Sequence, residues 1–215
     1  MIMIHACPPR EWYVNDFLIP SLTSQGIPKD EIIAWSDRDG RGNLSSCIET
    51  FYQCSLRDGE TWHLQDDVIV CRDFANRTAS APEGVVCGFC VNKYEDEIVT
   101  GRTIPKYMWQ SSFPCIKIPN YIAGEFVDWF IRNQHREGLQ KYIVTGKKDD
   151  TLFRIFMLEE HFGMDVYNMA PHLVDHIDWM IGGSTINQTR PFRARAHFWD
   201  DEDLITELQQ KLAGR

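Results

Sequence analysis

Two adjacent carboxylates, Asp66 and Asp67, lie in the segment WHLQDDVIV, residues 62–70, between apolar residues that are typical of β-strands. Burying an ionised carboxylate costs several kcal/mol unless a cation or a set of hydrogen-bond donors compensates the charge. The chain has two other Asp-Asp pairs, at residues 149–150 and 200–201, and both lie in polar or helix-starting surroundings. The context of Asp66-Asp67 therefore favours a bound metal ion, and a solvated acidic turn between two strands is the alternative.

The elements that would position this pair are strands and helices that alternate over the first 70 residues. We expect strands at residues 2–6 and 31–35, a third strand that runs into Asp66-Asp67, and helices at residues 11–24 and 44–56. These predictions rest on β-type apolar runs and on apolar positions spaced three to four residues apart. Such an order is typical of a doubly wound α/β sheet, in which ligands bind at the carboxyl ends of parallel strands.

Polar residues follow each of the three predicted strands. Pro8 and Arg10 follow the first strand, Asp37, Arg41 and Asn43 follow the second, and Asp66 follows the third. Because the carboxyl ends of parallel strands meet at one edge, we expect these residues to converge on one ligand site. The alternative for the second loop is that its glycines only make a turn and Asn43 only caps the next helix. The chain contains neither G-x-G-x-x-G nor G-x-x-x-x-G-K-[ST], so any phosphate would have to be held by a metal.

The second half of the chain predicts helices at residues 121–133 and 151–162, a short strand at residues 164–168 and a terminal helix at residues 200–212. Asp149 and Asp150 precede the second of these helices, where capping is the default role of a carboxylate and chemistry is the alternative. His172 and His176 are four residues apart, as in a zinc-binding helix. Leu173 stands where a zinc protease requires glutamate, which excludes that class.

Composition is that of a soluble globular domain, with 215 residues, 43% hydrophobic and 25% charged. No apolar stretch approaches the ~20 residues of a membrane span and the first residues lack signal-peptide features, so we expect no membrane insertion and a cytoplasmic location.

Seven cysteines in strand-like and helix-like segments indicate reduced thiols. The net charge of −9 argues against a long nucleic-acid footprint. Arg190, Arg193 and Arg195 nevertheless form a local basic cluster, whose alternative is a solvated strand paired with nearby carboxylates.

The segment HLQDDVIV, residues 63–70, resembles the metal motif of GT-A-type glycosyltransferases, in particular the LEDD segment of the lipooligosaccharide and procollagen galactosyltransferase group and of small phage glycosyltransferases. The segment PHLVDHIDWMIGGSTI, residues 171–186, resembles the segment with which those chains close the site. The resemblance implies an α/β fold, a single GT-A (Rossmann-like) domain over residues 1–215 with a mostly parallel central sheet flanked by helices. Residues 1–80 would be the nucleotide-sugar-binding half and residues 81–215 the acceptor-side half. Gln65 departs from the acidic residue of many relatives, which leaves Asp66 and Asp67 to bind metal and ribose.

The same resemblance implies transfer of a sugar from a nucleotide-sugar, with a UDP-sugar favoured, to a hydroxyl acceptor. Mn²⁺ or Mg²⁺ would be held by Asp66, Asp67 and His176, because hard divalent ions take oxygen ligands and neutralise a leaving diphosphate. The residues that would contact the nucleotide are Pro8, Arg10, Asp37, Arg41, Asn43 and Asp66.

The acceptor expected from the resemblance is a 5-hydroxymethylpyrimidine base in phage DNA, contacted through Arg190, Arg193 and Arg195, in the host cytoplasm. Surface glycans or proteins are acceptors that the resemblance fits as well. The alternatives in other classes are a sugar nucleotidyltransferase and a non-enzymatic, metal-stabilised binding module.

Inverting transfer requires a general base within ~3 Å of the acceptor oxygen. We expect Asp150 to be this catalytic base, pointing into the cleft, and Asp149 to cap the helix.

Overall fold

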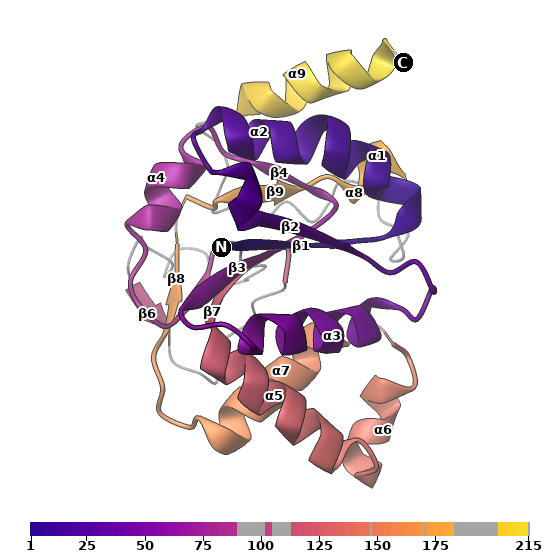
Figure 1. Cartoon of the computed structure of the whole chain (residues 1–215), viewed down its shortest axis with the longest axis vertical. Coiled ribbons are helices and arrows are strands. Elements are labelled where there is room, and N and C mark those ends of the chain that lie inside the picture. Colours follow the sequence, from indigo (N-terminus) through magenta and orange to yellow (C-terminus); the bar gives the residue numbers. More distant parts are fainter. Residues whose placement is uncertain (90–101, 105–112, 147, 170, 183–201, 215) are drawn as a thin grey trace.

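Alternating strands and helices build a central sheet that is covered by helices on both faces, as the computed structural model of the chain shows (Figure 1). The structure describes residues 1–89, 102–104, 113–146, 148–169, 171–182 and 202–214. Within these residues the central sheet has seven strands in the order β2-β1-β3-β7-β5-β8-β6. Their bounds are β1 Ile2–Ala6, β2 Ile32–Ser36, β3 Glu60–Gln65, β5 Val85–Cys87, β6 Arg102–Ile104, β7 Cys115–Pro119 and β8 Val166–Asn168.

Most strands of this sheet point the same way, which confirms the expected fold class. Strand β1 pairs in parallel with both β2 and β3, with Ile4 opposite Ala34 on one side and Leu64 on the other. Strand β7 is antiparallel to β3 and to β5, β8 is parallel to β5, and β6 is antiparallel to β8. Five of the seven described strands therefore share one direction, and strands from both predicted halves of the chain form one sheet.

Two layers of helices enclose the sheet (Figure 1). One layer holds the helical run η1 Pro8–Arg10, α1 Glu11–Tyr13, η2 Val14–Leu18 and α2 Ile19–Ser24, together with α4 Phe74–Ala79 and α9 Glu202–Ala213. The same side carries a small antiparallel sheet of β4 Val68–Val70 and β9 Val174–His176, followed by α8 Asp178–Ile181. The other layer consists of α3 Asn43–Ser55, α5 Asn120–Asn133, α6 Glu137–Ile143 and α7 Asp149–Glu160. A further turn, η3 Lys29–Glu31, precedes β2.

The helix expected at residues 11–24 is present, but its middle turn is a π-helix. Pro20 has no backbone N–H to donate to the preceding turn, and the wider turn of η2 directly precedes it. The apolar positions Tyr13, Leu18 and Leu22 still face inward and are fully buried. The other expected helices and the short strand before residue 169 agree with the observed elements within one to three residues.

Separate hydrophobic cores fill the two sides of the sheet. One core joins β1, β3 and β4 to the helices of the first layer, with Tyr13, Trp62 and Phe74 among its larger side chains. The other packs α3, α5 and α7 through Phe51 and Phe126. None of the helices in the described part of the chain has the length and apolar character to cross a membrane.

The close packing around Gly88, the residue directly after β5, gives the first prediction. A Cβ added at Gly88 would lie 2.6 Å from Sγ of Cys115 and 2.9 Å from Cδ1 of Leu173, and both side chains are fully buried. We expect Gly88→Ala to lower the free energy of unfolding by about 1–3 kcal/mol, as overpacking in a close-packed core does. The matched control is Gly138→Ala in α6, where no atom lies within 4 Å of the added Cβ, and which should raise stability by up to about 1 kcal/mol. Urea unfolding measures both, and equal stability of the Gly88 variant and the unmodified protein would contradict the packing.

Candidate active site

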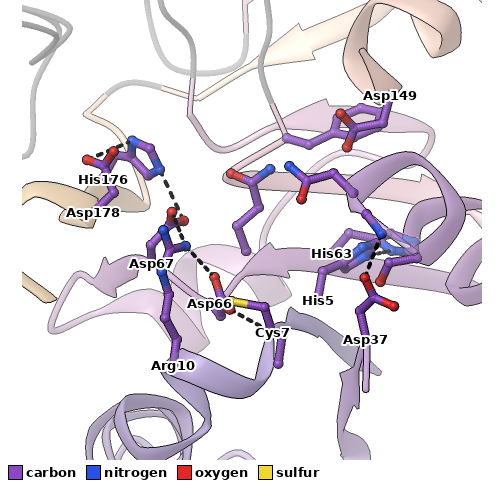
Figure 2. A pocket seen from close by; sticks show the side chains of 16 residues that line it. His5, Cys7, Arg10, Asp37, His63, Asp66, Asp67, Asp149, His176 and Asp178 are labelled. Carbon is purple, nitrogen blue, oxygen red and sulfur yellow. Dashed lines mark hydrogen bonds and ion pairs between the residues drawn. The ribbon is translucent and has the colours of Figure 1, made fainter. Parts of the chain in front are cut away.

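A polar cavity opens at the carboxyl ends of β1, β2 and β3, where the sequence predicts the ligand site (Figure 2). It encloses about 850 Å³ of empty space, part of which is open to solvent. The described residues that line it are His5, Ala6, Cys7, Arg10, Asp37, Gly42, Asn43, Ser46, His63, Gln65, Asp66, Asp67, Phe113, Asp149, His176 and Asp178. Three strand ends, the start of α3, the start of α7 and the segment after β9 therefore converge, although they are far apart in the sequence.

The acidic pair lies in the two-residue turn between β3 and β4 and is compensated by a side chain of the protein itself. Nη1 of Arg10 donates to Oδ1 of Asp66 at 2.8 Å and to Oδ2 of Asp67 at 2.5 Å, and all three residues are buried. The backbone N–H of Cys7 donates to Oδ2 of Asp66 at 2.7 Å. The alternative of a solvated acidic turn is therefore wrong, because the cation that burial of these carboxylates requires is present.

The two prolines after β1 bring Arg10 to this position. Pro8 and Pro9 cannot donate to a continuing strand, and the chain instead makes a 3₁₀ turn in which the N–H of Arg10 bonds to the carbonyl of Cys7 at 2.9 Å. Nε of Arg10 also donates to the carbonyl of Gly182 at 3.1 Å, which ties the turn to the end of α8. Pro8 itself is exposed and does not line the cavity, so the expected contact between Pro8 and a ligand finds no support in the geometry.

His176 stands beside the acidic pair because β9 pairs with β4, which places His176 opposite Val68. Its Nε2 lies 3.1 Å from Oδ1 of Asp67, and its Nδ1 lies 3.7 Å from Oδ1 of Asp178 (Figure 2). Oδ1 of Asp67 is buried and accepts no well-formed hydrogen bond within the described residues. The expected proximity of His176 to Asp67 is thus present, and Asp178 stands on the far side of the imidazole.

The electrostatics of the pair are uneven. Burial raises the pKa of Asp66, and the neighbouring charge of Asp67 raises it further, against the opposing effect of Arg10. Burial also acts to raise the pKa of Asp67, but the contact with His176 and the charge of Arg10 outweigh it and lower the pKa. Desolvation acts to lower the pKa of His176, while Asp67 and Asp178 raise it, with a net rise. Asp67 is therefore the more strongly ionised member of the pair, held between the guanidinium of Arg10 and the imidazole of His176.

The donor set fits a divalent ion that is shared with a ligand rather than enclosed by protein. Within the described residues, no group of three or more His, Cys, Asp or Glu is arranged to hold a metal. Two neighbouring ligand atoms on an octahedral ion with bonds of about 2.1 Å lie about 3 Å apart, and the 3.1 Å between Asp67 Oδ1 and His176 Nε2 matches this. Mg²⁺-type sites commonly use one or two protein ligands and complete the shell with phosphate and water. Both oxygens of Asp66 already accept hydrogen bonds, so Asp66 is poorly placed to be a ligand.

The loop after β2 reaches the cavity, but its predicted residues differ in what they do. The two carboxylate oxygens of Asp37 accept the backbone N–H groups of Arg41 and Gly42 at 2.9 and 2.7 Å, which shapes the loop. Gly42 adopts a φ of 90°, a conformation that glycine tolerates, and α3 then begins with Asn43. Asn43 lines the cavity, whereas Arg41 is exposed, pairs with Glu49 and does not line it. The expected contact of Arg41 with the nucleotide therefore finds no support in the geometry and stays a prediction.

The acidic pair at the start of α7 has the opposite orientation to the one expected. Asp149 is buried and lines the cavity, while Oδ1 of Asp150 accepts the N–H of Thr151 at 2.7 Å. Asp149, and not the expected Asp150, lines the cavity, and neither carboxylate caps the helix, because α7 begins at Asp149 and has no side-chain cap hydrogen bond. The helical phase explains this orientation, because Leu152, Phe153 and Phe156 face the core and fix which of the two carboxylates points inward. Burial, together with Asp150, raises the pKa of Asp149 to about 6.

The lining residues that the sequence did not predict include four with polar side chains that bear on the chemistry of the cavity: His5, Ser46, His63 and Asp178. His5 and His63 form a buried pair, with 2.9 Å between Nε2 of His5 and Nδ1 of His63, and burial lowers the pKa of His5 to about 4. Nε2 of His63 and Oγ of Ser46 are buried and have no hydrogen-bond partner within the described residues. Two features of the sequence could have indicated these residues. A histidine lies near the end of each of two apolar strands, and Asp178 follows the candidate ligand His176 by two residues.

The basic cluster at Arg190, Arg193 and Arg195 lies outside the described residues, so its expected contact with DNA remains a prediction.

Comparisons with known proteins add a likeness in fold. No protein-family model matches the chain, and no curated protein matches it. Among solved structures, the chain is similar to the inositol-1-phosphate CTP transferase from T. maritima, with a TM-score of 0.47 and 11% sequence identity over 98% of this chain and 95% of that chain. A likeness at this level carries no inference about activity, so the functional argument rests on the cavity.

The raised pKa of Asp149 predicts a pH-dependent cost to stability. A carboxyl whose pKa rises from 3.8 to about 6 on folding binds its proton more tightly in the folded state, so its charge destabilises the protein above about pH 6 and not below about pH 4. Asp149→Asn should therefore raise the free energy of unfolding at pH 7 by up to about 3 kcal/mol, and the gain should vanish between pH 6 and 4. Urea unfolding across this range measures it. Asp165→Asn, at an exposed position directly before β8, is the control, and a gain independent of pH in the Asp149 variant would contradict the assignment.

Proposed function

We propose that the protein is a metal-dependent glycosyltransferase that moves a sugar from a nucleotide-sugar, with a UDP-sugar favoured, to a hydroxyl acceptor. The observation that carries the proposal is the acidic pair Asp66-Asp67 beside His176, buried in a polar cavity at the carboxyl ends of three parallel strands. Ligands of open α/β sheets bind at this edge. The sequence resemblance of the two segments that carry these residues points to the same class of enzyme.

The charge of the cavity supports a donor that brings a metal with it. Five carboxylates and one arginine stand among the described residues that line the cavity, and the arginine is bound to two of the carboxylates. A diphosphate entering alone would be repelled by such a lining. A divalent ion bound by Asp67 and His176 would offset part of this negative charge, and when bound it would neutralise the leaving diphosphate. Oδ1 of Asp178 lies 3.7 Å from Nδ1 of His176, so a small approach would let it orient the imidazole, as carboxylates behind metal-bound histidines do.

The remaining polar groups of the cavity provide for the rest of the donor. Asn43 at the start of α3 and the unpartnered Ser46 Oγ and His63 Nε2 are placed to bind the nucleoside. Buried polar groups without partners cost free energy, and a ligand that pairs them recovers it. Arg10 is placed to bind the diphosphate, since a guanidinium matches phosphate oxygens in pairs.

Asp149 replaces Asp150 as the proposed general base. It lines the cavity and its pKa of about 6 lies close to the value that suits a base operating near neutral pH. Figure 2 shows Asp149 on the side of the cavity away from Asp67 and His176, and all three residues line the same cavity. The proposed acceptor is a 5-hydroxymethylpyrimidine base in DNA, a proposal that rests on the sequence resemblance and on the basic cluster at residues 190–195.

The test is an assay of donor use by the full chain. A panel of UDP-sugars is incubated with Mn²⁺ and with 5-hydroxymethylpyrimidine DNA, a glycan or a peptide, and released UDP and the mass of the acceptor are measured. We expect metal-dependent UDP release, lost in EDTA and in Asp67→Asn. Release of pyrophosphate from a nucleoside triphosphate and a sugar phosphate would instead identify a nucleotidyltransferase. Binding of UDP and Mn²⁺ without any turnover would identify a binding module.

The proposed base gives a separate prediction. Asp149→Asn should lower kcat by roughly 10²–10⁴, the contribution of general-base catalysis, with little change in the affinity for UDP. In the unmodified enzyme, kcat/KM should fall as the pH drops through about 6, because a protonated Asp149 cannot accept a proton. Asp150→Asn is the neighbouring control and should keep most of the activity. An Asp149 variant that turns over normally would place the base elsewhere.

A further inference from the structure

Arg10 supplies the positive charge that the buried acidic pair requires. Its Nη1 lies 2.8 Å from Asp66 and 2.5 Å from Asp67, and its side chain is buried. The guanidinium stays charged at every physiological pH, so loss of a proton cannot release it. Two adjacent buried carboxylates without a counter-ion would be strongly destabilised, so the ligand-free protein needs this contact.

A divalent ion and the guanidinium compete for the same carboxylate. Oδ2 of Asp67 is held by Arg10, while Oδ1 faces His176 and accepts no well-formed hydrogen bond within the described residues. An ion bound at Asp67 would lie next to a buried positive charge, and like charges in a desolvated site repel strongly. The ion therefore binds well only when Arg10 leaves the pair or when a negative group joins the site.

We propose that Arg10 is an exchangeable counter-ion that makes metal binding depend on the diphosphate: the ion binds at Oδ1 of Asp67, the guanidinium leaves Oδ2, and Arg10 turns to the phosphate oxygens. This inference rests on the proposed function. Arg10 is suited to the exchange because its five N–H donors can bond to phosphate as well as to carboxylate. Its place at the end of the turn after β1, inside the cavity, allows both partners to lie within reach of one side chain.

The exchange couples two binding events. If the diphosphate draws Arg10 away from the pair, it raises the affinity for the ion, and by linkage the ion raises the affinity for the diphosphate by the same factor. Metal alone should bind weakly to the unmodified protein. A neutral residue at position 10 removes the competing charge, so metal alone should then bind tightly.

The experiment measures Mn²⁺ binding by calorimetry and by the loss of the free-ion electron paramagnetic resonance signal, without nucleotide. We expect Arg10→Gln to bind Mn²⁺ at least about 10-fold more tightly than the unmodified protein, within the range of about 5–150-fold typical of coupled sites. Arg10→Lys keeps the charge and should bind Mn²⁺ alone as weakly as the unmodified protein. Arg136→Gln removes an exposed arginine that pairs with Glu159 outside the cavity, and it should change nothing.

A second measurement uses the unmodified protein and tests the exchange of Arg10 even if Arg10→Gln fails to fold without metal. UDP should increase the amount of Mn²⁺ bound to protein at a fixed free-ion concentration, and this increase should be smaller in Arg10→Lys, whose ammonium cannot pair with two phosphate oxygens. Equal Mn²⁺ affinity with and without UDP in the unmodified protein would overturn the exchange.

The failure of this inference differs from the failure of the proposed function. Sugar transfer that continues in EDTA would mean that Arg10 replaces the metal permanently, which overturns the exchange and leaves glycosyl transfer intact. Tight binding of Mn²⁺ alone by the unmodified protein, with metal-dependent transfer intact, also overturns the exchange only. Absence of binding of Mn²⁺ and of UDP, together with no use of any nucleotide-sugar, would overturn both proposals.

Discussion

The contact between Arg10 and the two carboxylates Asp66 and Asp67 is the interaction on which the rest of the site depends. Two negative charges at the buried end of β3 require compensation, and a single guanidinium nitrogen within 2.8 Å of one and 2.5 Å of the other provides it. The contact joins the turn after β1 to the turn after β3, and through Nε it reaches the carbonyl of Gly182 at the end of α8. Removing one partner would leave a buried charge unpaired, which is why these three segments keep their relative positions.

Around this contact the protein keeps polar groups in places where a packed core would be more stable. Ser46 and His63 each bury a polar atom without a partner in the described part of the chain, and Asp149 is held with a pKa of about 6 by burial. A fold selected for stability alone would fill such positions with apolar side chains. The two hydrophobic cores on either side of the sheet supply the stability that offsets these costs, and the unpartnered groups mark the cavity as a place for a ligand.

The strands, most helices and the location of the site follow from local patterns in the sequence, because apolar runs and helical periodicity are local properties. The contact of Arg10 with the acidic pair could not be predicted from local patterns in the sequence. Arg10 and Asp66 are 56 residues apart, and their contact depends on the register of β1 with β3. The same limit explains why the side chains of Asp149, Asp150 and Arg41 lie differently from what the sequence led us to expect. Whether Asp149 or Asp150 points inward depends on how α7 packs against the core. Arg41 forms an ion pair with Glu49 of α3 and does not reach the cavity.

The most direct test of the account is a crystal structure of the protein grown with Mn²⁺ and UDP, with the metal located by its anomalous scattering. The account predicts one manganese peak at bonding distance, about 2.1 Å, from Asp67 and His176, with the diphosphate on its open side and Arg10 turned toward the phosphate oxygens. A nucleotide bound outside the cavity, or a cavity in which Arg10 still holds both carboxylates and no metal lies beside Asp67, would contradict it.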